Sequence, residues 1–235
     1  NNHIKKFDYS KIFIHVDNNT KEHCLEYFLK ETSLEKFEII ESKDGEENKN
    51  IESCLKIWDS ISSAGCDRNS LLINLGGGVV TDMGGFIAST YKRGINYVNV
   101  PTTLLSMVDA SVGGKTGVDF GILKNQIGTF YDPQGVIVDP FFLNTLSENQ
   151  ILSGYAEIFK HSLISENHLF RDLIKHERIS YDLKTIYQSI QVKNNIVLVD
   201  KKESKERKSL NFGHTLGHAI ESFFLNTNKK LLHGE

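Results

Sequence analysis

The sequence predicts an α/β fold with a parallel sheet in its N-terminal part, followed by an all-α part. Short apolar runs alternate with amphipathic helical patterns up to residue 146, and helical patterns alone follow. Alternation of strands and helices implies a parallel sheet covered by helices on both faces. We therefore expect an α/β domain at residues 1–146, a helical domain at residues 147–235 and a cleft between them.

The individual elements follow from the spacing of apolar residues. Short apolar runs predict strands at residues 11–16, 37–40, 70–75, 96–100 and 135–138. Helical spacing in the first domain covers residues 20–30 and 48–64. In the second domain, it covers residues 147–164, 168–175, 182–199 and 209–224.

Composition argues against several classes of function. The 235 residues are 39% hydrophobic and carry a net charge of −3, with no basic stripe that would suit nucleic acid. No apolar stretch approaches the ~18 residues needed to span a bilayer, and the N-terminus lacks a signal-peptide core. Cys24, Cys54 and Cys66 form no C-x-x-C pair, which fits a reducing compartment. We expect a cytoplasmic protein with no membrane or nucleic-acid partner.

The stretch LLINLGGGVVTDMGGF places three glycines between a predicted strand and a helical pattern. Such a turn lets backbone N–H groups approach a pyrophosphate, and the helix N-terminus adds positive potential. The usual dinucleotide fingerprint G-x-G-x-x-G would need glycine at position 81, which is Thr81. The pattern here is G-G-G-x-x-x-D, ending at Asp82. Taken alone, it leaves phosphate binding and a structural turn equally open.

Residues 101–131 predict a long polar loop rich in glycine. Gly113, Gly114, Gly117 and Gly121 stand near Lys115 and Lys124. Glycines beside lysines suit the close approach of backbone to an anion, and polar loops of this length are usually functional. Anion binding is favoured here over an ordinary surface loop.

The helical part contains a candidate metal site. His214 and His218 stand four residues apart on one helical face, which alone is weak evidence. Glu157 among apolar residues and His233 near the chain end could complete a set of imidazole and carboxylate ligands. Two histidines and one glutamate leave an open position, as in catalytic zinc sites. The remaining histidines are predicted to be structural or surface residues. The segment Lys201–Lys208 has charges of both signs and is predicted to form a solvated loop or helix end.

Seven motifs, in order, carry a family resemblance: GGGVVTD, YKRG, VPTTLLSMVDASVGGKTGV, LKNQIG, GYAEIFK, NFGHTLGHAIE and HGE. They resemble the 3-dehydroquinate synthases, sugar-phosphate cyclases related to iron- and zinc-dependent alcohol dehydrogenases. The resemblance implies an NAD-binding first domain, a second domain with a divalent metal (zinc first, cobalt as the alternative) and a homodimer. It also implies conversion of 3-deoxy-D-arabino-heptulosonate 7-phosphate to 3-dehydroquinate and phosphate, in the shikimate pathway of aromatic amino acid biosynthesis. The resemblance further implies that NAD accepts a hydride from the substrate and returns it within one turnover, so that the cofactor is regenerated.

The resemblance also implies roles for individual residues. Glu157, His214 and His233 match the metal ligands. The NAD contacts match Asp17, Glu46, Lys49, Gly76, Gly77, Gly78, Asp82, Thr102, Thr103, Lys124, Phe142 and Thr145. The phosphate contacts match Lys115, Asn125, Asn211 and His218, with Arg93 contributed across the dimer interface. Arg207 and Lys193 match the pair that holds the substrate carboxylate, and Asp109 and Lys160 match residues that meet its hydroxyls. Asp109, Lys115, Lys160, Arg207 and His218 form the implied catalytic set. Asp200, Glu203 and Arg207 fit the family pattern D-x-x-E-x-x-x-R.

Three alternatives stay open at this point. They are an NAD-dependent polyol or alcohol dehydrogenase of the related branch, a cyclase for another sugar phosphate, and a chain that binds NAD without chemistry. Lys115, Asn125, Arg207 and Lys193 argue against a dehydrogenase, because a simple alcohol offers no phosphate or carboxylate to bind. Family members continue beyond the HGE motif, so we expect this chain to be a fragment.

Overall fold

The computed structural model describes residues 9–121, 123–165, 168–175, 179, 181–224 and 231–234. The chain forms two compact units, the first of Asn1–Thr102 and Gly114–Asp139, the second of Thr103–Gly113 and Pro140–Glu235. The sequence places the boundary at residue 146 and does not predict that Thr103–Gly113 joins the helical unit.

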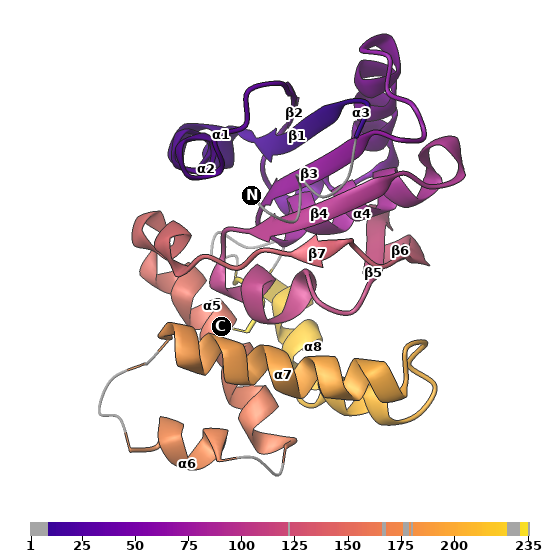
Figure 1. Ribbon diagram of the computed structural model, residues 1–235. Coiled ribbons are helices and arrows are strands. Elements are labelled where there is room, and N and C mark those ends of the chain that lie inside the picture. The colour runs from indigo at the N-terminus through magenta and orange to yellow at the C-terminus, as the bar shows by residue number, and fades with distance from the viewer. Residues whose placement is uncertain are drawn as a thin grey trace. The chain divides into compact units, whose positions relative to one another are not determined.

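The first unit is built on a five-stranded sheet in the order β2-β1-β3-β4-β7, in which every described pairing is parallel (Figure 1). The strands are β1 (Ile12–Asp17), β2 (Glu38–Ser42), β3 (Leu71–Gly76), β4 (Asn96–Pro101) and β7 (Gly135–Val136). Central strand β3 is buried at every position, because helices cover parallel sheets on both faces. The predicted parallel α/β sheet is confirmed.

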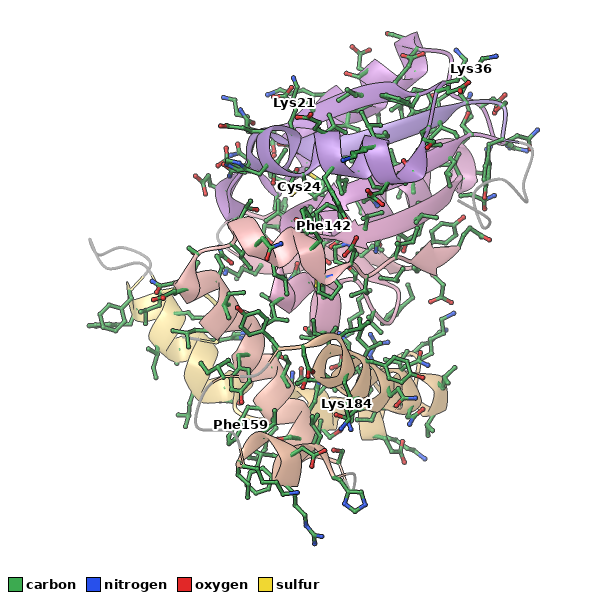
Figure 2. All side chains as sticks on the ribbon, turned by 60° about the vertical axis from the view of Figure 1, so that its left-hand side comes forward. Lys21, Cys24, Lys36, Phe142, Phe159 and Lys184 are labelled. Carbon is green, nitrogen blue, oxygen red and sulfur yellow. The ribbon has the colours of Figure 1, made fainter. Side chains whose placement is uncertain are left out.

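Two short helices follow β1, where the sequence predicts one. Asp17 begins α1 (Asn18–His23), since its Oδ1 accepts the backbone N–H of Thr20 at 2.8 Å while the Thr20 hydroxyl accepts the N–H of Asp17. The chain bends at Cys24, and α2 (Leu25–Thr32) begins there. Cys24, labelled in Figure 2, is a buried free thiol. Helix α3 (Ile51–Ser63) begins at the side-chain cap of Asn50.

The predicted loop at residues 101–131 is wrong, because much of this segment is regular structure. It contains an antiparallel hairpin of β5 (Lys115–Phe120) and β6 (Leu123–Phe130). Glycine lets the strands approach closely, since a Cβ on Gly128 would lie 2.2 Å from the carbonyl oxygen of Thr116. Strand β6 is largely exposed, so it lacks the apolar alternation by which strands are recognised.

Helix α4 (Gly78–Thr90) packs against β3 and β4 and against β5 of the hairpin. This explains why its interior is apolar nearly throughout and why it contains two adjacent glycines. A Cβ on Gly84 would lie 1.9 Å from Oδ1 of Asn74, and one on Gly85 would lie 2.5 Å from Cγ2 of Thr116. The glycines therefore allow close approach of the helix to strands β3 and β5.

A row of buried polar side chains crosses the sheet. His15, Asn74 and Asn99 occupy paired positions on β1, β3 and β4, and Asn74 donates to Oδ1 of Asn99 at 3.0 Å. Nε2 of His15 lies 3.1 Å from the Ser42 hydroxyl oxygen. Burial lowers the pKa of His15 from 6.5 to about 4, although Asn74 opposes this shift, so the imidazole is neutral at pH 7.

The second unit consists of α5 (Glu148–Leu163), α6 (Leu169–Leu173), α7 (Leu183–Val199) and α8 (His214–Phe224), with a π-helical turn at Ser106–Ala110. That turn packs on α5 and α7. Phe159 of α5, labelled in Figure 2, lies against Phe170 of α6. No helix in the described part of the chain is long and apolar enough to cross a membrane.

The predicted helix at 209–224 is wrong in its first part. A 3-10 turn at Glu206–Asn211 precedes α8, and Gly213 separates the two with a positive φ of 84°. This left-handed backbone, which glycine adopts most readily, ends one segment and lets the next begin at His214.

We expect Gly84→Ala to destabilise the first unit. The added Cβ overlaps the Asn74 side chain, which Asn99 holds in place, and overpacking of this kind costs about 1–3 kcal/mol. Gly135→Ala is the matched control, because its added Cβ meets nothing within 4 Å. Urea unfolding measures both, and equal effects of the two substitutions would contradict the close approach.

We also expect the protein to become less stable as the pH falls, because His15 is buried as a neutral imidazole. Because its folded-state pKa of about 4 lies below the ordinary 6.5, its contribution is fully present above pH 6.5 and is lost as the pH falls toward 4. Between pH 7 and pH 5 the loss amounts to about 2 kcal/mol. Urea unfolding at both pH values should show a smaller pH dependence in His15→Gln than in the wild type. An equal change in the free energy of unfolding between pH 7 and pH 5 in both proteins would rule out His15 as the cause.

Candidate active site

The glycine turn stands at the carboxyl end of β3, where parallel sheets bind their ligands. The backbone N–H of Thr102, which follows β4, donates to the carbonyl of Gly76 at 3.0 Å, so two of the predicted NAD-binding segments are joined. A Cβ on Gly76 would lie 2.5 Å from Cβ of Val80, so the turn into α4 requires glycine here. Gly77 stands at the N-cap, where no side chain of the described residues caps the helix. The first-turn amides of α4 are therefore oriented to bind an anion.

Lys49 is buried beside this turn. Its Nζ donates to Oδ2 of Asp82 at 2.6 Å and to Oδ1 of Asn125 at 2.7 Å. Burial opposes the charge, but the carboxylates of Asp82 and Glu46 outweigh it and raise the pKa of Lys49. Lys124 lies near Glu46, with its Nζ 3.8 Å from Oε1 of that residue.

The predicted phosphate contacts of the hairpin do not lie together. Asn125 is held at Lys49, where its backbone is left-handed (φ 54°) and its N–H donates to Asp119. Lys115 lies at the opposite end of the hairpin, paired with Phe130. Arg93 stands in the exposed turn after α4, with a φ of 69°. The structure thus groups Asn125 with predicted cofactor contacts rather than with Lys115.

Two ion pairs lie in the second unit, and in both of them the lysine is buried. Nζ of Lys193 on α7 donates to Oδ1 of Asp109 at 2.6 Å and also to its backbone carbonyl. Lys160 and Glu157, one turn apart on α5, form the other pair. Burial would raise the pKa of Asp109, but Lys193 and then Lys160 overcome it and hold that pKa far below its usual value. Burial lowers the pKa of Lys193 despite its carboxylate partner.

Arg207 is buried with 1% of its surface exposed, so the prediction of a solvated charge run is wrong at this residue. Its guanidinium donates to the carbonyls of Lys201 at 2.6 Å and Gly113 at 2.9 Å. The carboxylate of Asp200 stabilises the loop between Asp200 and Arg207 by accepting hydrogen bonds from the backbone N–H groups of Ser204, Lys205 and Arg207. Burial alone would raise the pKa of Asp200, but these donors lower it to about 2. Asn211 donates to Glu203 in the same loop.

Three imidazoles converge near α5. His214, His218 and His233 present nitrogens that all lie within 4.8 Å of one another. Nε2 of His233 lies 3.4 Å from Oε1 of Glu157, so the buried carboxylate adjoins the cluster. The hydrogen bond to Glu157 raises the pKa of His233, whereas burial and the charge of Lys160 lower that of His214. This donor set, imidazoles beside a carboxylate, fits a divalent metal of the zinc type.

Glu221 is a residue of this cluster that the sequence analysis missed. Its Oε1 lies 2.9 Å from Nδ1 of His233, whose Nε2 faces Glu157. The backbone carbonyl of His233 accepts the hydroxyl of Ser153, so both the chain and the ring are held. The signal available in the sequence was the position of Glu221 at the end of NFGHTLGHAIE, one helical turn beyond His218.

A second set of possible ligands is already occupied by protein cations. Asp109, Glu157 and His161 also have ligand atoms within 4.8 Å of one another. Lys193 pairs with Asp109 and Lys160 with Glu157, so both carboxylates of this set have an ammonium partner. His161, predicted from the sequence to be a structural or surface residue, therefore lies inside the charged cluster.

The remaining predicted cofactor contacts lie in different units. Asp17 is the last residue of β1, and Thr102 is the last residue of the first of the two segments that form the first unit. Thr103 belongs to the second unit, where its hydroxyl accepts the N–H of Ser106. Phe142, labelled in Figure 2, is buried in the 3-10 turn Pro140–Thr145, which also carries Thr145.

Solved structures of this fold belong to sugar cyclases and related dehydrogenases. The 2-deoxy-scyllo-inosose synthase complexed with carbaglucose-6-phosphate, NAD+ and Co2+ is 25% identical, with a TM-score of 0.84 over 97% of this chain and 64% of that one. ValA (2-epi-5-epi-valiolone synthase) from Streptomyces hygroscopicus subsp. jinggangensis 5008, with NAD+ and Zn2+ bound, is 28% identical, with a TM-score of 0.85 over 98% and 66%. An iron-containing alcohol dehydrogenase at 15% identity shares the fold, with a TM-score of 0.64. The chain thus has the architecture of the sugar-phosphate cyclases.

The chain belongs to the 3-dehydroquinate synthase family. The N-terminal model of that family matches residues 39–153, and the C-terminal model matches residues 154–235. The chain is 47% identical to the 3-dehydroquinate synthase of Parabacteroides distasonis, over 98% of this chain and 67% of the relative. It is 42% identical to that of Pelagibacter ubique, over 97% and 63%. The chain thus spans about two thirds of the length of these relatives, and the predicted family is confirmed.

We expect Asp82→Asn to destabilise the first unit, because it leaves the buried ammonium of Lys49 without its carboxylate. Breaking a buried pair in this way costs about 3 kcal/mol, and Lys49→Met in the same chain should recover most of it. The exposed pair Lys21–Glu41 is the matched control, for which Glu41→Gln should cost at most about 1 kcal/mol. Urea unfolding of the wild type and these three variants measures the cost of breaking each pair, and equal costs for the buried and the exposed pair would contradict this account.

Proposed function

We propose that this chain carries the 3-dehydroquinate synthase reaction, converting 3-deoxy-D-arabino-heptulosonate 7-phosphate to 3-dehydroquinate and phosphate. The observation that carries the proposal is the burial of three cationic side chains, Lys160, Lys193 and Arg207, in the second unit. Burying a cation is costly unless an anion or dipole accompanies it. A substrate with a carboxylate and a phosphate uses such groups, whereas a simple alcohol does not.

The residues divide by the part of the substrate they would meet. Arg207 and Lys193 would hold the carboxylate, for which the planar guanidinium is geometrically suited. Asp109 and Lys160 would meet the hydroxyl groups. Lys115, Asn125, Asn211 and His218 would contact the phosphate. We also propose that the protein is a cytoplasmic homodimer in which a second copy supplies Arg93.

The first unit would bind NAD at the carboxyl end of its sheet. The turn Gly76–Gly78 and the uncapped amides of α4 would hold the pyrophosphate, with Lys49, Asp82 and Thr102 beside them. Solved cyclases of this fold are described with NAD+ bound, which supports the assignment. Bound there, NAD would accept a hydride from the substrate and return it in the same turnover.

The second unit would bind a divalent metal through Glu157, His214 and His233, with zinc as the first choice and cobalt as the alternative. Solved sugar cyclases of this fold are described with Co2+ or Zn2+ bound, and the converging imidazoles of this chain fit either ion. When bound, such an ion polarises a hydroxyl group and lowers its pKa. His218, whose nitrogen lies with those of His214 and His233, is the competing candidate for the third ligand.

We expect Glu157→Gln to weaken zinc binding more than His218→Gln does. Loss of a direct ligand should lower affinity by about a hundred-fold or more, beyond the ten- to hundred-fold typical of a residue that only supports a ligand. Glu148→Gln, an exposed glutamate on the same helix, is the control. Competition with a chromophoric chelator measures affinity without any turnover. A larger loss in His218→Gln would reassign the third ligand to that histidine.

The reaction itself is tested by phosphate release in the natural protein that carries this sequence. We expect phosphate in many-fold excess over added NAD, with no net NADH in the absorbance, since the cofactor is regenerated. Net NADH from a polyol without phosphate release would establish a dehydrogenase instead. Turnover of a different sugar phosphate, with this substrate inert, would keep the cyclase class and overturn the substrate.

A further inference from the structure

One ring nitrogen of a buried histidine has no hydrogen-bond partner among the described residues. His161 on α5 is fully buried, and its Nδ1 lies 2.8 Å from Oγ of Ser189 on α7. Its Nε2 lies 3.9 Å from Oδ1 of Asp109 and makes no hydrogen bond within the described chain. Buried polar atoms are nearly always satisfied, so this exception calls for an explanation.

The charge of the ring follows from its surroundings. Burial lowers the pKa of His161 to about 4, and although Asp109 opposes the shift, Lys160 and Lys193 add to it. The imidazole is therefore neutral at pH 7 and carries one N–H.

The position of that proton follows from the two neighbours of the ring. A proton on Nδ1 would leave the Nε2 lone pair facing the carboxylate of Asp109, which is repulsive. A proton on Nε2 directs an N–H at the carboxylate and lets the Ser189 hydroxyl donate to Nδ1. Electrostatics favours the second arrangement, and the gap of 3.9 Å closes to a hydrogen bond with a small rotation of the Asp109 carboxylate.

We propose that His161, kept in its Nε2–H form by Ser189, is a positioning residue for the carboxylate of Asp109. Asp109 lies on a π-helical turn, and the long, flexible side chain of Lys193 alone does not fix the plane of its carboxylate. The rigid imidazole supplies a second, fixed donor. This inference rests on the proposed function, in which Asp109 meets a substrate hydroxyl.

Two substitutions separate this role from a packing role. In His161→Gln the amide nitrogen can occupy the place of Nε2 and keep the donor toward Asp109. In His161→Asn the amide reaches only the place of Nδ1, which keeps Ser189 and loses the donor. We expect kcat to fall about tenfold or more in His161→Asn and to change by less than about threefold in His161→Gln, at similar thermal stability.

Two further readouts keep the test independent of folding. In an Asp109→Asn background, His161→Asn should add little further loss, because the histidine acts through the missing carboxylate. His15→Asn, a change at the other buried His–Ser pair, should lower thermal stability and leave kcat at saturating NAD unchanged. Equal losses of kcat in His161→Gln and His161→Asn, or full additivity with Asp109→Asn, would overturn the proposal.

The proton position can be read without activity. Nitrogen chemical shifts of His161 in isotope-labelled protein should show protonated Nε2 in the wild type and a mixture of both tautomers in Ser189→Ala. Protonated Nδ1 in the wild type would refute the positioning role whatever the enzyme's activity. Failure of the proposed function is recognised separately, as an absence of phosphate release from wild-type protein whose His161 shows protonated Nε2.

Discussion

The helical unit depends on the pairing of the charges that it buries. Removing an ammonium or carboxylate group from water costs several kcal/mol, and this cost is recovered only with close partners of opposite sign. Lys193 meets Asp109 at 2.6 Å, and Lys160 meets Glu157 one turn away. The Lys193–Asp109 pair joins α7 to the turn of Ser106–Ala110, whereas the Lys160–Glu157 pair lies within α5. Because α5, α7 and this turn pack on one another, their packing and the placement of the charged groups depend on each other.

The sequence predicts the sheet well and the hairpin not at all, for a common physical reason. Strands such as β3 are buried on both faces, so they appear as apolar runs that end at glycine. Strand β6 is exposed along most of its length, and its register depends on the close approach of Gly117 and Gly128, which no local pattern records. Apolar periodicity reports burial, so it misses strands that are stabilised mainly by backbone pairing.

The candidate site, like the fold, could be predicted from the sequence only in part. Family motifs point to Glu157, His214 and His233, and the structure brings these side chains close to one another. Spacing gives no signal for His161, whose significance lies in the Asp109 carboxylate that it faces from another segment. For Glu221, spacing places the residue one turn beyond His218 but does not reveal its contact with Nδ1 of His233. The burial of Lys49 and Arg207 is likewise a tertiary effect, since each stands in a charged stretch that suggests solvent.

The balance of charge in the helical unit bears on the kind of ligand that would bind there. Burial lowers the pKa of Lys193, and repulsion from Lys160 and Arg207 lowers it further, so the attraction of Asp109 does not fully offset these effects. A cation whose pKa is depressed in the absence of ligand gains stability when an anion binds beside it. A neutral alcohol would leave this repulsion unrelieved, whereas a carboxylate would relieve it at Lys193 and Arg207 together. The same repulsion that makes the unit costly to fold without ligand therefore favours an anionic substrate over a neutral one.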